Sequence, residues 1–206
     1  MTSLEYILQH KIVAILRGLH AADVINVATA LHEGGINIIE VTLNSNDALS
    51  LIKKLSSTFE NKMLVGAGTV LTVSDARSAI DAGAHFLISP TLDVNVIKIA
   101  KNHSVVSIPG AFTPTEIFTA YQNGADIIKI FPAQSPEYIK QILAPLDKVL
   151  VMPTGGIDIN NIEAYKKTGA SAFGIGSSLV SNKEKVDELY LRNLTAKAKR
   201  FVEAIK

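Results

Sequence analysis

One lysine stands where a charged side chain is unusual. Lys129 lies in the segment Asp-Ile-Ile-Lys-Ile-Phe-Pro, which is otherwise apolar and typical of a buried strand. Either the side chain extends to water or binds a phosphate, or its amine is kept neutral and acts as a nucleophile. A free lysine has a pKa of about 10.4, and lowering it by about three units corresponds to roughly 4 kcal/mol. Burial in an apolar interior disfavours the charged form and activates lysine toward carbonyl carbons.

Glu40 is the second candidate, because it ends the apolar run Ile36-Asn-Ile-Ile-Glu. Side chains alternate along a strand, so Ile36, Ile38 and Glu40 share one face. A simple ion pair with Lys129 is one interpretation, but such pairing would raise the lysine pKa. Catalysis instead predicts a carboxyl group near the amine without a tight salt bridge, where it moves substrate protons directly or through water.

Two glycine-rich loops are candidates for binding an anion. The segments Thr154-Gly-Gly-Ile-Asp and Gly174-Ile-Gly-Ser-Ser each accompany an apolar run and lead toward a helix. Backbone amides at successive strand ends of a barrel form a recurrent phosphate site. The predicted donors are Gly155, Gly156, Gly176 and Ser177.

Arg17 and Thr69 end two further apolar runs, Ile-Leu-Arg-Gly and Gly-Ala-Gly-Thr-Val. A guanidinium group binds a carboxylate with two parallel hydrogen bonds, and a hydroxyl group can add a third. Arg17 also fits a structural ion pair, and Thr69 fits a simple strand preference. The five histidines show no spacing typical of metal ligands, so we expect no metal and no other cofactor.

A framework of alternating strands and helices is predicted to position these residues. The eight short apolar runs that predict strands are 12–16, 36–43, 63–70, 85–89, 105–109, 126–131, 148–153 and 172–175. Apolar residues between them recur at helical spacing, as at Val24, Val27, Ala28 and Leu31. Helix starts are predicted at Thr113, Ser135 and Asp158. Left-handed helix ends are predicted at Gly34, Gly83, Gly124 and Gly169.

Repeated strand–helix units without a linker predict one domain spanning residues 1–206, a closed (β/α)8 barrel (TIM barrel) with a short N-terminal helix. An open doubly wound sheet is the competing architecture. A barrel places its active site at the carboxyl ends of the strands. Arg17, Glu40, Thr69, Lys129 and Thr154 all fall at such ends, with Glu40 and Lys129 on even-numbered strands that contribute to the same interior layers.

The composition excludes several classes of partner. Twenty basic and nineteen acidic residues leave a net charge of +1, which favours neither nucleic acid nor an anionic membrane surface. There is no cysteine, so disulfides and thiolate chemistry are absent. The N-terminal segment lacks the basic start and apolar stretch of a signal peptide. We therefore expect a cytoplasmic protein that acts on a small molecule.

Together these motifs resemble the 2-keto-3-deoxy-6-phosphogluconate (KDPG) aldolase family, which includes phosphogalactonate and 4-hydroxy-2-oxoglutarate (KHG) aldolases. The motifs that carry the resemblance, named by their first residues, are Val13-Ala-Ile-Leu-Arg-Gly, Ile39-Glu-Val-Thr-Leu, Gly66-Ala-Gly-Thr-Val, Ile88-Ser-Pro, Ile108-Pro-Gly, Thr113-Pro-Thr-Glu, Lys129-Ile-Phe-Pro-Ala and Pro153-Thr-Gly-Gly-Ile. They follow the family order and cover nearly the whole chain.

The resemblance implies a role for each candidate. Lys129 matches the Schiff-base lysine, Glu40 the acid/base glutamate and Thr69 a ligand of the pyruvate carboxylate. The residues that match the substrate and phosphate loops are Thr154, Gly155, Gly156, Gly176 and Ser177, and those that match the pocket walls are Pro90 and Phe131. The substrate implied is a phosphorylated 2-keto-3-deoxy sugar acid, cleaved to pyruvate and glyceraldehyde 3-phosphate, and the implied assembly is a homotrimer.

One position departs from the family pattern. Many phosphogluconate-type members have an arginine after the Glu-Val-Thr-Leu segment, where this chain has Asn44. Arg17, used by phosphogalactonate-type members among others, can take over the charge. The configuration of the sugar acid therefore stays open. Two other classes also remain open, a phosphosugar isomerase or epimerase and a non-catalytic phosphosugar-binding protein, because fold alone does not determine chemistry.

Overall fold

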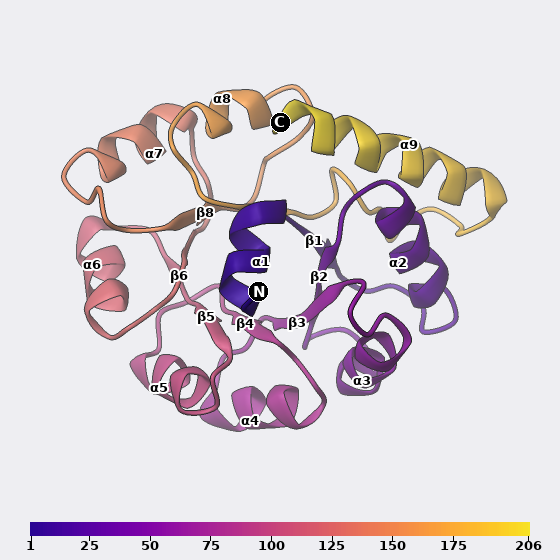
Figure 1. Cartoon of the computed structure of the whole chain (residues 1–206), viewed down its shortest axis with the longest axis horizontal. Coiled ribbons are helices and arrows are strands. Elements are labelled where there is room, and N and C mark those ends of the chain that lie inside the picture. Colours follow the sequence, from indigo (N-terminus) through magenta and orange to yellow (C-terminus); the bar gives the residue numbers. More distant parts are fainter.

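The computed structural model describes residues 1–206 and arranges helices around a curled parallel sheet (Figure 1). The strands are β1 (Ile12–Leu16), β2 (Ile38–Thr42), β3 (Leu64–Gly68), β4 (Phe86–Ile88), β5 (Val106–Ile108), β6 (Gly110–Ala111), β7 (Ile128–Ile130), β8 (Val151–Pro153) and β9 (Phe173–Ile175). The helices are α1 (Ser3–His10), α2 (Val24–Glu33), α3 (Ala48–Thr58), α4 (Val73–Asp81), α5 (Val94–Asn102), α6 (Pro114–Gln122), α7 (Pro136–Leu143), α8 (Ile162–Lys166) and α9 (Glu188–Ala204).

The strand order follows the chain order. One sheet runs β5-β4-β3-β2-β1-β9 and a second runs β6-β7-β8, and all pairs are parallel. A bridge between Thr154 and Gly174 links the end of β8 to β9. The last strand thus lies beside the first, whereas an open doubly wound sheet reverses its order at a switch point.

Each predicted apolar run contains an observed strand, but the run 105–109 is followed by a further short one. Pro109 separates β5 from β6 and has no N–H group to continue a strand ladder. Its carbonyl oxygen still accepts a hydrogen bond from the Lys129 N–H group, at 2.9 Å. The interruption therefore lies next to the strand that carries the lysine.

Two of the three predicted helix starts are confirmed. Thr113 and Ser135 are the N-caps of α6 and α7. The prediction for Asp158 is wrong, because the N-cap of α8 is Asn161. The Asp158 carboxylate instead accepts the Asn161 N–H group, at 3.1 Å, in the turn that precedes the helix. Short aspartate side chains form such turns as readily as helix caps.

Three of the four predicted left-handed glycines are confirmed, namely Gly83, Gly124 and Gly169. The prediction for Gly34 is wrong, since its φ is −82° and Gly35 is the left-handed residue, with φ 87°. Gly34 has another reason to lack a side chain. A Cβ atom there would lie 2.3 Å from Cβ of Ala198, so glycine allows α2 and α9 to pack closely.

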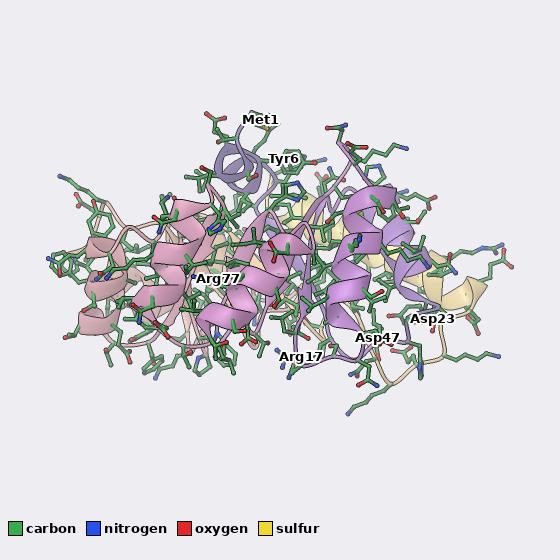
Figure 2. The ribbon with its side chains drawn as sticks, turned by 90° about the horizontal axis from the view of Figure 1, so that it is seen from below. Met1, Tyr6, Arg17, Asp23, Asp47 and Arg77 are labelled. Atoms are coloured by element: carbon green, nitrogen blue, oxygen red, sulfur yellow. The ribbon has the colours of Figure 1, made fainter.

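The two faces of the molecule differ. Figure 2 shows α1, with Met1 and Tyr6, on the face opposite Arg17, Asp23 and Asp47. Ile7 of α1 is fully buried in a small apolar cluster with residues of the sheet, so α1 packs against one end of the strands. The other face, at the carboxyl ends of the strands, is formed by the loops that follow the strands. No helix in the structure combines the length and apolar character needed to cross a bilayer.

Candidate active site

A cavity of about 350 Å³ opens at the carboxyl ends of the strands. The residues predicted from the sequence that line this strand-end cavity are Arg17, Lys129, Phe131, Thr154, Gly155, Gly156, Gly176 and Ser177. Glu40, Thr69 and Pro90 were also predicted but do not line it. A cavity of about 790 Å³ lies beside α1, but none of its titratable side chains, Tyr6, Glu60 and His85, is buried.

Lys129 carries the buried amine of the strand-end cavity. It lies in the middle of β7, between Gly110 of β6 and Met152 of β8, and is only 4% exposed. Its Nζ atom is 4.8 Å from the centre of the Phe131 ring. Burial lowers the pKa of Lys129; the nearby charge of Arg17 lowers it further, and that of Glu40 raises it. The pKa is therefore lowered overall, so the neutral amine is easier to reach than in a free lysine.

Glu40 is a buried carboxyl group without a partner. It lies in β2 between Ile15 of β1 and Gly66 of β3, and is 1% exposed. No ion pair joins it to Lys129, and its Oε2 atom has no hydrogen-bond partner. Burial raises the pKa of Glu40, although the charges of Lys129 and Arg17 act in the opposite direction. A carboxyl group that holds its proton more tightly is suited to exchanging protons near neutral pH.

The exposed Arg17 lies at a junction of three loops. The N–H group of the next residue, Gly18, donates to Oγ of Ser45, at 2.9 Å, and this hydroxyl also shares a hydrogen bond with Thr42. A Cβ atom on Gly18 would lie 3.0 Å from Nδ2 of Asn182. The loops after β1, β2 and β9 therefore meet beside the arginine.

The two glycine-rich loops present unused backbone donors to the strand-end cavity. The amides that donate no hydrogen bond within the chain include those of Gly155, Gly156, Gly176 and Ser177. Gly155 and Gly156 have φ values of 92° and 73°, which side chains disfavour. The Ser178 hydroxyl donates to the carbonyl oxygen of Ile157 and so joins one loop to the other. Free amides that line a cavity are suited to an anion.

The remaining predicted residues have distinct environments. Thr154 is buried and directs its hydroxyl group close to Gly174, where a Cβ atom would lie 2.3 Å from Oγ1. Thr69 follows β3 and has φ 57°, which is rare for a β-branched residue and is a form of strain often found at functional sites. The Pro90 backbone lies against Gly110, whose Cβ would be 2.4 Å from the Pro90 carbonyl carbon.

The strand-end cavity has further lining residues that sequence reasoning did not name as site residues, namely Ile15, Val180, Asn182 and, within the two predicted loops, Ile157, Asp158, Gly174 and Ser178. Most of them lie within or next to these loops or in β1, so their position along the chain could have indicated them. Asn182 carried no such signal, because it lies in the irregular segment between β9 and α9. No cluster of three His, Cys, Asp or Glu side chains that could hold a metal ion occurs in the structure.

Comparison with known proteins identifies the family. The model of the KDPG and KHG aldolase family matches residues 4–192. A probable 2-dehydro-3-deoxy-6-phosphogalactonate aldolase of Rhizobium meliloti is 37% identical, over 84% of this chain and 82% of that protein. A 2-dehydro-3-deoxy-phosphogluconate aldolase of Haemophilus influenzae is 32% identical, over 79% and 77%.

Solved structures give the same result. A native KDPGal structure has a TM-score of 0.87 and 30% identity, and the match covers 94% of this chain and 93% of that one. The KDPG aldolase of Legionella pneumophila, with pyruvate captured as a covalent carbinolamine, has a TM-score of 0.80 and 27% identity, over 99% and 97%.

The fold and the strand-end cavity define an α/β enzyme with a curled parallel sheet. The chain belongs to the KDPG and KHG aldolase family. It is therefore a lyase that cleaves carbon–carbon bonds, and not the isomerase, epimerase or binding protein that the sequence left open.

Proposed function

We propose that the chain is a class I aldolase, independent of metal, that cleaves a 2-keto-3-deoxy-6-phospho sugar acid of gluconate or galactonate configuration into pyruvate and glyceraldehyde 3-phosphate. The observation that carries the proposal is the buried Lys129 at the strand-end cavity, which has no ion-pair partner and a lowered pKa. Relatives named for both configurations support this choice of substrate class. Cleavage of 4-hydroxy-2-oxoglutarate to pyruvate and glyoxylate is proposed as a second activity.

In this reaction the neutral Nζ of Lys129 attacks the C2 ketone, and the carbinolamine loses water to give an iminium ion. Removal of the C4 hydroxyl proton breaks the C3–C4 bond, releases the aldehyde and leaves the electron pair in an enamine. Protonation at C3 and addition of water then release pyruvate and regenerate the amine. Glu40 moves the protons, directly or through water.

The two charged ends of the substrate are assigned to different parts of the site. The phosphate is held by the free amides of Gly155, Gly156, Gly176 and Ser177. The carboxylate is held by Arg17 and Thr69. The residues proposed to enclose the reacting carbons are Pro90, Phe131 and Thr154. This orientation places the ketone between the two ends, at Lys129.

Parallel assays of pyruvate release from the two phosphorylated acids and from 4-hydroxy-2-oxoglutarate test the proposal. At least one phosphorylated acid is expected to be cleaved. 4-Hydroxy-2-oxoglutarate has no phosphate and cannot use the hydrogen bonds that bind a charged phosphate. Its kcat/KM is therefore expected to be at least about tenfold lower than that of the cleaved phosphorylated acid. The ratio between the two phosphorylated acids identifies the configuration at C4. Pyruvate release from none of the three acids would contradict the proposed function.

The proposed enzyme is a single domain, a closed (β/α)8 barrel, which assembles as a homotrimer in the cytoplasm. The exposed rings of Phe118 and Tyr121, which stack on each other on α6, support self-association. Sedimentation velocity is expected to show a species of three times the chain mass of 22.1 kDa. A monomer at micromolar concentration would contradict the trimer, and recovery of the protein in a membrane or secreted fraction would contradict the location.

A further inference from the structure

The end of β3 has no side chain on the face that Glu40 occupies. Glu40 pairs with Gly66, and Thr42 pairs with Gly68, so residues 66 and 68 lie beside the glutamate. A Cβ atom on Gly68 would lie 1.6 Å from Oε1 of Glu40 and 2.3 Å from its Cδ. The carboxyl group therefore fills the space that any side chain at residue 68 would need.

The backbone around Gly68 is fixed by its neighbours. Its carbonyl oxygen accepts the Leu43 N–H group, at 2.8 Å, and the N–H group of Val70 donates to Ile88, at 3.1 Å. Between these two hydrogen bonds lies the left-handed Thr69. Because these hydrogen bonds hold the strand, the overlap with a side chain at residue 68 is relieved by movement of the Glu40 carboxyl group.

Gly66 has a different neighbour, although it is on the same strand. A Cβ atom there would lie 2.3 Å from the ring of Phe86, a fully buried side chain of β4. Glycine within a strand weakens it and often marks a close approach of another group. At Gly66 that group belongs to the core, and at Gly68 it is the carboxyl group of Glu40.

We propose that Gly68 is a positioning residue of the aldolase, which holds no substrate but allows the Glu40 carboxyl group to lie over the end of β3. The proposal rests on the acid/base role proposed for Glu40. A methyl group at residue 68 displaces the carboxyl group from this place. The carboxyl group then lies too far from the reacting carbons to transfer protons there.

Gly68→Ala, Glu40→Ala and the double variant test the proposal as a cycle. In the native chain, Gly68→Ala is expected to lower kcat by about 100-fold and to give a pH profile of kcat/KM like that of Glu40→Ala. In the Glu40→Ala background, where the overlapping atoms are gone, the same change is expected to alter kcat by less than about twofold. An equal loss in both backgrounds would overturn the proposal.

Thermal melting keeps the test decisive if Gly68→Ala alone does not fold. Folding of the double variant but not of Gly68→Ala supports the overlap with Glu40, whereas failure of both overturns it. Gly66→Ala is the matched control, expected to lower the melting temperature through Phe86 while keeping the native pH profile. Full activity of Glu40→Ala would instead contradict the proposed acid/base role. The melting comparison would still test whether a side chain at residue 68 overlaps with Glu40.

Discussion

Replacing Lys129 by Met is expected to lower turnover on the order of 10⁴-fold or more, because it removes the nucleophile on which each step depends. Met keeps a long apolar stem in the space between β6 and β8, so the fold is expected to persist. Pyruvate release measures the activity, and circular dichroism with thermal melting measures the fold.

The native protein and Lys129→Met are expected to differ in how their stability depends on pH. The pKa of Lys129 is lower in the folded chain than its ordinary 10.5, so the unfolded chain binds more protons between the two values. Stability contributed by this group therefore rises with pH across that window in the native protein. The Met variant is expected to lose this rise.

Lys98→Met is the matched control for Lys129. Lys98 is an exposed lysine on α5, outside the strand-end cavity, and its replacement is expected to leave turnover unchanged. Native turnover in Lys129→Met, or an equal loss in Lys98→Met, would refute the nucleophile assignment.

Replacing Glu40 by Gln is expected to lower kcat by about 10²- to 10⁴-fold, the usual contribution of a general acid or base. The amide has nearly the same shape as the carboxyl group, so Gly68 still leaves room for it. The effect therefore reports the loss of proton transfer rather than a change in packing. Initial rates at saturating substrate measure it.

The pH dependence of this variant is expected to shift in a defined direction. The Glu40 charge raises the pKa of Lys129, so removing that charge lowers it. Activity that depends on the neutral amine falls as the pH drops through this pKa. The acidic limb of kcat/KM due to Lys129 is therefore expected to move to lower pH in Glu40→Gln.

Glu33→Gln serves as the control for Glu40, because Glu33 is an exposed carboxylate on α2 that does not line the strand-end cavity. It is expected to keep the native rate and pH profile. A Glu40→Gln variant with a native rate, or with its acidic limb moved to higher pH, would show that Glu40 has another role.

Most of the fold could be predicted because strand and helix periods are local properties of the sequence. The apolar runs at 12–16 and 36–43 contain β1 and β2, and Thr113 caps α6. Gly34 could not be understood locally, since the reason for its missing side chain is Ala198, which lies far along the chain in α9.

The candidate site was predictable where residues end strands, because parallel strands end at one face. Arg17 and Thr154 directly follow β1 and β8, and both line the strand-end cavity together with Lys129, which lies in the middle of β7 and not at its end. Asn182 was missed, because the position of a residue in an irregular segment is set by tertiary contacts and not by periodicity. The overlap of Gly68 with Glu40 was missed because it depends on how β2 and β3 pair, which neither sequence motif shows by itself.

Covalent trapping with pyruvate tests whether Lys129 is the Schiff-base nucleophile. The protein is incubated with pyruvate and sodium borohydride, which reduces an iminium ion to a stable secondary amine, and its peptides are mapped by mass spectrometry. A pyruvate-derived adduct is expected on the peptide that contains Lys129, and none is expected in Lys129→Met. An adduct on a different lysine, or no adduct at all, would contradict this assignment.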